Sequence, residues 1–573
     1  MIPRNEHPNP NFKRADYIIL NGEWDFEFDF GNSGEERNLF AVDSEFSKKI
    51  NVPFCPESEL SGINYKDFIP AVWYKRTVEI SKEQLNGKAF IVFGAVDFHS
   101  KVYVNGELAG EHFGGYTTFR IDATKYLKEG ENVITVYAED DTRDYHQARG
   151  KQSELFYSHG CDYTRTTGIW QTVYMEFCPE SYIKNVKYYP NIADGTVTIT
   201  ADLCGSGDFS AKAFWDGKEV GSKAVKTYGQ TATLTLDLAE KHLWEVGKGG
   251  LYELTLTFGD DVVTSFFGLR EVKLTDNAVE INGEPVFQRL ILDQGFYPDG
   301  IYTAPTKEAL KNDIILSMKA GFNGARLHQK VFEPLFLHYC DELGYIVWGE
   351  HGNWGLDWSK FDSIRYFLLE IEEEIERDFN HPALIGWCPY NETWDIDGRK
   401  QDDDSLRVVY RTVKAMDKTR PCVDTSGNFH VETDIFDVHD YEQDYHIFKE
   451  NYDKLFKENS LYDRFPEKQQ WKGEPVFMSE YGGIRIELKD PAENDHKKAW
   501  GYGNAATSYE EFYERYAGLT DTLLDNPRMI GFCYTQLTDV EQELNGIYYY
   551  DRTEKFDSEI LYKINSRKAA IEK

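Results

Sequence analysis

The sequence predicts a multidomain chain in which two β-sandwiches precede a (β/α)8 barrel, and three observations lead to this fold class. Short strand-like segments separated by turn residues fill residues 1–270 of the 573. Strands and helices then alternate, which is typical of a parallel barrel. Two of the later strands end on a glutamate, at the edge where parallel folds place their chemistry.

Residues 1–178 are expected to form a β jelly roll. Residues 72–80 and 101–104 have strand character, and the Asn105-Gly106 pair that follows is a strong hairpin signal. Residues 179–270 continue with segments such as 251–257, which predicts an immunoglobulin-like sandwich without its disulfide.

Residues 271–573 are expected to form the barrel. Helices are predicted at 306–320, where apolar residues recur at helical spacing, at 363–379, and at 557–572 as a closing helix. The eight strand candidates are 287–292, 324–327, 345–348, 384–389, 422–425, 435–439, 476–479 and 530–534.

Composition excludes several classes of function. The formal charge of −35, from 63 basic and 98 acidic residues, opposes nucleic-acid binding. No apolar stretch approaches the ~20 residues that span a bilayer, so no membrane role is expected. The N-terminus lacks the basic start and apolar core of a secretory signal, which favours a cytoplasmic location. The eight cysteines are scattered singly, without zinc-site or disulfide-framework spacing.

The two glutamates are the central hypothesis. An apolar run from residue 384 ends on Asn391-Glu392, and a second run from residue 475 ends on Ser479-Glu480. A single glutamate at a strand end more often serves structure. Two carboxylates brought together in a pocket are what glycoside hydrolysis requires.

These segments resemble glycoside hydrolase family 2, the β-galactosidase, β-glucuronidase and β-mannosidase group of retaining glycosidases. The resemblance rests on two motifs: Ile-Gly-Trp followed by Asn391-Glu392, and Ser-Glu480-Tyr-Gly-Gly. Residues 105–119 and 167–171 resemble the family's N-terminal sugar-binding-type domain. The resemblance implies that Glu392 is the proton donor and later general base, and that Glu480 is the nucleophile.

The resemblance also implies roles around this pair. Arg326 and Tyr441 match the residues that bond the nucleophile, Asn391 matches the residue that holds the sugar 2-hydroxyl, and Asp162 matches an acid that reaches the sugar from the N-terminal domain. Structural pairing for Arg326 and Tyr441, and a solvated loop acid for Asp162, are the alternatives. Further strand-end residues expected at the substrate are His328, Glu350, His351, Trp354 as a stacking platform, His439 and Tyr534.

A proton donor needs a raised pKa. We expect the pKa of Glu392 to be raised by ionised Glu480 and by an apolar setting of Trp387, Tyr390 and Trp394.

Departures from the family pattern bear on the sugar. Gln329 stands where the family commonly has a histidine, and Glu350 is a single, shifted acid where it has an Asp-Glu pair. The Asn-x-Lys carboxylate reader of the glucuronidases is missing after residues 545–547, although Lys330 is a substitute to consider. A β-galactoside is therefore preferred, followed by an α-L-arabinoside and a β-mannoside, with a β-glucuronide disfavoured.

The mechanism requires no metal or organic cofactor. Some relatives use magnesium near the acid, and the altered segment 348–351 leaves that question open. The rival class is a carbohydrate-binding protein without turnover, which has no need of a proton donor. The expected partner is a carbohydrate substrate, and the sequence does not set the oligomeric state.

Overall fold

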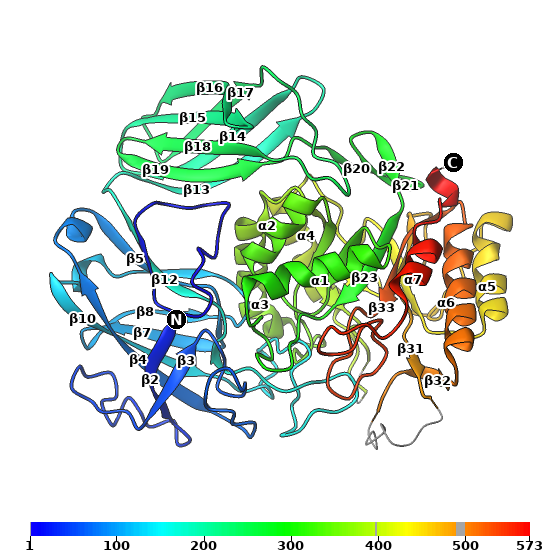
Figure 1. The fold of residues 1–573 in the computed structure, drawn as a ribbon, viewed down its shortest axis with the longest axis horizontal. Coiled ribbons are helices and arrows are strands. Elements are labelled where there is room, and N and C mark those ends of the chain that lie inside the picture. Colours follow the sequence, from blue (N-terminus) through cyan, green and yellow to red (C-terminus); the bar gives the residue numbers. More distant parts are fainter. Residues whose placement is uncertain (1, 396–397, 489–498, 573) are drawn as a thin grey trace.

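The computed structural model describes residues 2–395, 398–488 and 499–572. The predicted order of two β-sandwiches and a barrel is confirmed, and Figure 1 shows both sandwiches on one side of the barrel. The exact boundaries at residues 178 and 270 stay predictions. No helix among the described residues is both long and apolar enough to cross a membrane.

The N-terminal sandwich packs two antiparallel sheets around a core of alternating apolar side chains. Asn105 and Gly106 have positive φ, as the predicted two-residue hairpin requires. One sheet contains, in order, β3 (Lys48–Val52), β2 (Gly22–Phe28), β4 (Ala71–Ile80), β10 (Gly130–Glu139), β7 (His99–Val104) and β8 (Glu107–Phe113). The other contains β1 (Tyr17–Ile19), β12 (Val173–Cys178), β5 (Lys88–Phe93) and β9 (Phe119–Asp122), and a small pair joins β6 (Val96–Asp97) to β11 (Gly168–Ile169).

The middle sandwich has its own apolar core, and its one cysteine, Cys204, is free, so no disulfide joins its two sheets. One sheet contains β13 (Tyr182–Asn191), β14 (Thr196–Cys204) and β17 (Thr231–Asp237), and the facing sheet contains β16 (Lys218–Lys226), β15 (Asp208–Trp215), β18 (Tyr252–Phe258) and β19 (Asp261–Phe267). A short antiparallel sheet of β20 (Val272–Thr275), β21 (Ala278–Ile281) and β22 (Glu284–Val286) follows.

All eight predicted barrel strands are present, with each end within three residues of the expected position. Seven pair in parallel in the order β26 (Leu384–Cys388), β25 (Ile346–Glu350), β24 (Gly324–Leu327), β23 (Gln288–Asp293), β33 (Met529–Thr535), β30 (Val476–Gly482) and β29 (Phe436–Asp440). The eighth, β28 (Thr425–Ser426), pairs in parallel with β27 (Tyr390–Asn391), which continues the line of β26. A further small pair joins β31 (Ile484–Ile486) to β32 (Tyr502–Ala506).

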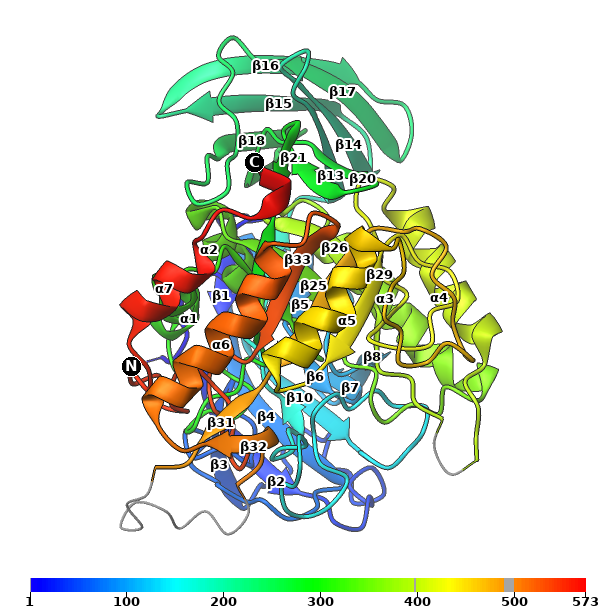
Figure 2. The ribbon, with the colours of Figure 1, turned by 90° about the vertical axis from the view of Figure 1, so that its right-hand side faces the viewer.

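Helices cover the outside of the barrel, and in Figure 2 α5 and α6 lie in front of β33. The predicted cap Thr306 accepts a hydrogen bond from the Ala309 amide and starts α1. The helices are α1 (Lys307–Lys319), α2 (Pro334–Leu343), α3 (Ile364–Asp378), α4 (Asp403–Met416), α5 (Tyr445–Lys457), α6 (Tyr509–Leu524) and α7 (Ser558–Asn565), with single 3-10 turns at Glu83–Leu85, Thr124–Tyr126, Phe361–Ser363 and Ala570–Glu572.

Two features differ from the expected alternation. Residues 427–435, between β28 and β29, form a loop instead of a helix. The closing helix ends at Asn565 instead of continuing to residue 572, because Arg289 binds the carbonyl oxygens of Asn565 and Arg567 at 2.8 Å each and the carboxylate of Glu572 at 2.6 Å. These contacts fold the last residues against the base of β23.

Candidate active site

The two predicted glutamates meet at the carboxyl end of the barrel. Glu480 lies in β30 and Glu392 directly follows β27. Glu392 has φ of +49°, a conformation worth about 1–3 kcal/mol of strain, and its amide is held by a 3.0 Å hydrogen bond to the Ser426 carbonyl. Carboxylate oxygens of Glu392 and Glu480 lie within 4.8 Å of each other and of a nitrogen of His439. Such a separation is typical of retaining glycosidases, because inverting enzymes leave room for a water molecule.

Arg326, at the end of β24, joins the other groups of the site. The side chain is 2% exposed. Its Nη1 donates to Glu480 Oε1 at 2.9 Å, its Nε donates to Glu350 Oε2 at 2.6 Å, and its Nη2 donates to Asn391 Oδ1 at 2.5 Å. The guanidinium fork thereby fixes two carboxylates and one amide in a single plane of contacts.

Tyr441 binds the second oxygen of the same glutamate. Its hydroxyl donates a short hydrogen bond to Glu480 Oε2 and lies 3.1 Å from Thr535 Oγ1. Its ring stacks face to face on Tyr502, with 3.3 Å between centroids. Both oxygens of Glu480 therefore have donors, which fix the orientation of the carboxylate.

The expected raised pKa of Glu392 is wrong for this structure. Burial raises the pKa of Glu392, but the hydrogen bond and charge of His439, whose Nδ1 lies 2.7 Å from Glu392 Oε1, outweigh it and lower the pKa. Burial lowers the pKa of His439, and the carboxylates of Glu480 and Glu392 outweigh that and raise it. The proton that we expected on Glu392 is thus held by the Glu392–His439 pair.

Only part of the expected apolar setting reaches Glu392. Trp394 Nε1 donates to Glu392 Oε2 at 3.3 Å. Trp387 instead donates to Asp417 at 2.9 Å, and the Tyr390 ring packs against Phe367.

Asn391 has an unused donor. Its amide donates to Asn353 Oδ1 at 2.9 Å, and its carbonyl accepts from Trp354 Nε1 at 3.1 Å. Its Oδ1 is held by Arg326, whereas its buried Nδ2 has no acceptor among the described residues. An orphaned buried donor beside two carboxylates is suited to a substrate hydroxyl.

Glu350 and His328 support the site from behind Arg326. Besides Arg326, Glu350 accepts from the Gln329 amide at 3.0 Å, and His328 Nδ1 lies 2.9 Å from Glu350 Oε1. Burial, together with the cations Lys151 and Arg326, holds the pKa of His328 well below its usual value, so the ring is neutral.

Three residues considered from the sequence lie away from this cluster. The His351 ring packs edge-on against Tyr116 and Phe367, and Tyr534 packs against Tyr481 and Tyr516 in the barrel wall. Lys330 donates to the carbonyls of Gly295 and Tyr302 at 2.6 and 2.8 Å, so two of its N–H groups are occupied by the backbone.

The polar loop of the N-terminal domain reaches the barrel, as the placement of Asp162 predicts. The amides of Arg149 and Gly150 donate to the Trp354 carbonyl at 2.8 and 3.1 Å. Asp162 itself accepts from Arg149 Nη1 at 2.5 Å. The loop therefore forms one wall of the site, and Asp162 forms an ion pair with Arg149 in this loop.

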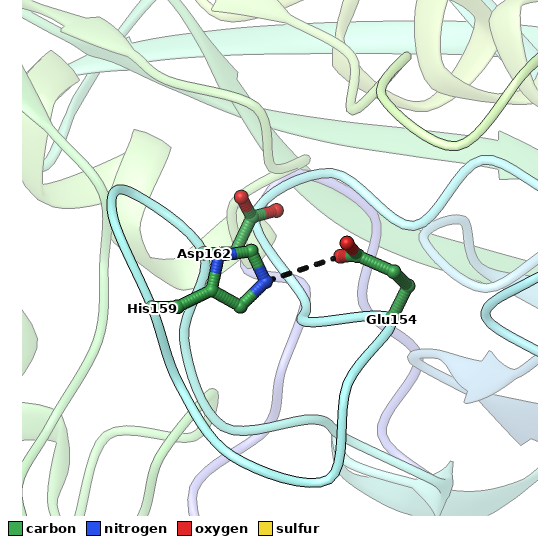
Figure 3. Close-up of side chains that lie close together, drawn as sticks. All are labelled: Glu154, His159 and Asp162. Carbon is green, nitrogen blue, oxygen red and sulfur yellow. Dashed lines mark ion pairs between the residues drawn. The ribbon is translucent and has the colours of Figure 1, made fainter.

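Two groups of side chains among the described residues have donor atoms close enough to share a metal ion. One is Glu392, His439 and Glu480. The other is Glu154, His159 and Asp162 in the N-terminal loop, drawn in Figure 3 with the 3.4 Å contact between His159 and Glu154. Arg149 contacts both acids of this second group, which opposes a further cation there.

Three groups were missed by the sequence reasoning. Lys151 is 5% exposed and lies over the Trp354 ring, Tyr502 stacks on Tyr441, and buried Glu543 accepts hydrogen bonds from Tyr163 and from Asn545 at 2.9 Å. Each belongs to a loop or a short strand pair whose sequence carries no periodic signal. A lysine in a polar loop is ordinarily solvated.

Comparison with known proteins identifies two domains of the chain. Residues 18–179 match the sugar binding domain of glycosyl hydrolases family 2, and residues 302–561 match the TIM barrel domain of the same family. A β-galactosidase of Thermoanaerobacter pseudethanolicus is 26% identical over 70% of this chain and 53% of its own length. A putative β-glucuronidase of Formosa agariphila is 28% identical over 59% of this chain and 41% of its own.

The chain thus spans about half the length of these curated relatives. The fold as a whole matches the crystal structure of Ruminococcus gnavus β-glucuronidase with a TM-score of 0.79, at 17% identity, over 98% of this chain and 100% of the other. The matches to two domains of one family, over residues 18–179 and 302–561, lead to one conclusion: the chain belongs to glycosyl hydrolases family 2.

Proposed function

We propose that the protein is a retaining exo-glycosidase that removes a terminal sugar by double displacement. Glu480 acts as the nucleophile and Glu392 as the acid and then the base. The observation that carries this proposal is the separation of at most 4.8 Å between oxygens of the two carboxylates, with Arg326 and Tyr441 both bound to Glu480.

The contacts assign a task to each group in the first step. Glu480 attacks the anomeric carbon, and Arg326 and Tyr441 stabilise the negative charge of Glu480 through their hydrogen bonds. As the sugar–oxygen bond breaks, Glu392 gives a proton to the leaving oxygen. Asn391 Nδ2 donates to a sugar hydroxyl, a hydrogen bond that strengthens as charge develops on the sugar ring. In the second step Glu392 takes a proton from the water that releases the sugar from Glu480.

His439 supplies the proton balance of these steps. The Glu392–His439 pair holds one proton across a 2.7 Å contact, and this proton is available to the leaving oxygen through Glu392. After the transfer both partners are unprotonated. Because Glu480 no longer carries a negative charge in the glycosyl-enzyme, the pKa of Glu392 falls, so Glu392 is ionised and able to accept the proton of the incoming water.

A β-D-galactoside is our first substrate. The missing Asn-x-Lys reader, the occupied Lys330 and the similarity to curated β-galactosidases support it. A β-D-glucuronide is the second candidate, because buried Lys151 places a cation at the site and other curated relatives carry the name β-glucuronidase. The α-L-arabinoside and the β-mannoside remain further choices for the assay.

The test is release of nitrophenol from a panel of nitrophenyl glycosides: β-galactoside, β-glucuronide, α-L-arabinoside, β-mannoside, β-glucoside and β-fucoside. Each substrate is run with the wild type and with Glu480→Gln, which removes the nucleophile without changing side-chain size. We expect one sugar to be cleaved by the wild type alone, with retained configuration by proton NMR of the first product. Turnover by Glu480→Gln at the wild-type rate would refute the nucleophile. Silence across the panel would favour either a glycan outside the panel or the binding-protein alternative, and sugar-induced changes in melting temperature would separate these two.

A further inference from the structure

A lysine of the N-terminal domain lies beside the candidate proton donor and takes part in none of the steps above. The Nζ of Lys151 is 3.8 Å from the centroid of the Trp354 ring. Trp354 in turn donates from Nε1 to the carbonyl of Asn391, the residue before Glu392. One aromatic ring therefore separates the ammonium from the backbone that carries the proton donor.

The backbone around Lys151 is fixed. A Cβ on Gly150, whose φ is +56°, would lie 2.5 Å from the Gln329 carbonyl oxygen and 2.6 Å from the Tyr116 hydroxyl. The Lys151 carbonyl accepts from the Tyr163 amide at 2.7 Å. Lys151 is thus held against the barrel by contacts on both sides, and its position does not depend on a mobile surface loop.

The ammonium has no hydrogen-bond acceptor and no ion pair within 4.0 Å in the part of the chain that the structure describes. Burial lowers the pKa of Lys151, but surrounding groups, among them Cys161 and Glu543, outweigh it and raise the pKa, so the side chain is charged. Only 5% of the residue is exposed, so solvent replaces the missing acceptors only in part, which is unfavourable for a cation. The contact with the Trp354 ring offsets part of this and leaves the N–H groups unused.

A second unused donor adjoins the same tryptophan. Asn391 Nδ2 is buried and has no acceptor among the described residues, while the carbonyl of the same residue binds Trp354 Nε1. Lys151 and Asn391 thus present donors without acceptors next to Glu392. The complementary ligand carries acceptor oxygens close to the bond that Glu392 protonates.

We propose that Lys151 is a substrate-binding residue whose ammonium donates hydrogen bonds to an oxygen of the terminal sugar, either a ring hydroxyl or a carboxylate. This inference rests on the proposed glycosidase function and extends it, because it assigns sugar recognition to a residue of the N-terminal domain. Removing the ammonium weakens binding of a neutral sugar through lost hydrogen bonds. It weakens binding of a uronic acid more, since an ion pair is also lost.

The experiment compares Lys151→Met, Lys151→Arg and the control Lys82→Met, which neutralises an exposed lysine of the same domain. Calorimetry gives the Kd of each protein for galactose and for glucuronic acid, and kcat and KM are measured on whichever nitrophenyl glycoside the wild type cleaves. We expect Lys151→Met to raise the Kd for the recognised sugar about tenfold or more. Lys151→Arg should raise this Kd less, and Lys82→Met should have the Kd of the wild type. Weaker binding of galactose by Lys151→Met would show that the ammonium binds a sugar hydroxyl. A larger loss of affinity that is confined to glucuronic acid would show that it binds the sugar carboxylate.

An unchanged Kd in folded Lys151→Met, with only a shifted pH profile, would overturn the proposal and leave Lys151 as a counter-charge for Glu392. Thermal melting establishes that the variants fold. If Lys151→Met does not fold, Lys151→Gln takes its place, and a Kd within twofold of the wild type again refutes the inference. If the wild type binds a sugar but cleaves no glycoside, the proposed activity fails while the binding role of Lys151 is still decided.

Discussion

Replacing Arg326 with lysine tests whether the guanidinium fork, and not charge alone, organises the site. Arg326 makes charge-assisted bonds of 2.9 Å to Glu480, 2.6 Å to Glu350 and 2.5 Å to Asn391. A lysine ammonium has no fork and keeps about one of these three contacts. Each of the two lost bonds contributes about 1.5–3 kcal/mol, so the change removes about 3–6 kcal/mol of interaction.

Part of this loss falls on folding and part on the transition state, in which Glu480 must be correctly oriented. We expect kcat/KM on the nitrophenyl substrate to fall at least about 10²-fold, since about 2.7 kcal/mol corresponds to that factor. The free energy of unfolding, measured in urea, is expected to fall by about 2–3 kcal/mol.

Arg420→Lys is the matched control. Arg420 is 4% exposed and also forms a fork, to Asp417 at 2.8 Å and to the carbonyls of Leu384 and Phe379 at 2.7 Å each, but it contacts neither glutamate. We expect this variant to lose comparable stability while the folded protein keeps kcat/KM within about threefold. If the two variants lose the same fraction of kcat/KM, Arg326 acts through stability alone and the reasoning above is refuted.

Three further predictions concern Glu392, His439 and Asp162. Glu392→Ala is expected to slow alkyl glycosides at least about tenfold more than activated nitrophenyl glycosides, and equal losses on both would argue against its acid role. His439→Gln is expected to destabilise the protein more at pH 6 than at pH 9: the two carboxylates outweigh burial and raise the pKa of His439 above 6.5, so the stability it contributes is present at low pH and lost as pH rises through the folded-state value. Urea unfolding at the two pH values measures this, and a larger loss at pH 9 would contradict it. Asp162→Ala leaves Arg149 without its 2.5 Å partner and is expected to raise KM or lower kcat from outside the barrel, whereas unchanged kinetics would mean that Asp162 only supports the loop.

The strands of the barrel could be predicted because each is a short apolar run closed by polar residues, and this pattern depends on the local sequence alone. The loop at 427–435 in place of a helix could not. That segment is held both by its own flank and by a distant side chain: the Asp424 carboxylate accepts from the amides of Val431 and Glu432 at 2.6 and 3.0 Å, and the His430 amide donates to Gln469 Oε1 at 2.9 Å. Such contacts follow from tertiary placement, which propensity does not encode.

Strand ends could be located, but the direction of their side chains could not. Successive residues of a strand face opposite sides. Glu350 therefore points to Arg326 while His351 packs against Tyr116, and Thr535 lies beside the Tyr441 hydroxyl while its neighbour Tyr534 faces the helices. An error of one residue at a strand end exchanges a site residue for a core residue, which is why two of the expected ligands lie outside the cluster.

The electrostatic error has a different origin. An apolar setting and a neighbouring carboxylate both raise the pKa of a glutamate, and on those grounds a raised value for Glu392 is expected. His439 reverses the sign because it lies 2.7 Å from Glu392 and closer than 4 Å to Glu480, so it is stabilised as a cation by both. The sequence places His439 at a strand end but does not give the rotamer that turns its Nδ1 toward Glu392.

Lys151 and Asn391 suggest how recognition and chemistry are divided between the domains. Arg326 and Tyr441 contact Glu480 directly, so substitutions there should act mainly on kcat. The ammonium of Lys151 lies over the ring of Trp354 and has no hydrogen bond to either glutamate, so its removal should act mainly through KM and sugar affinity. A Lys151→Met variant whose whole loss appeared in kcat would contradict this division and would place the N-terminal loop within the chemical step itself.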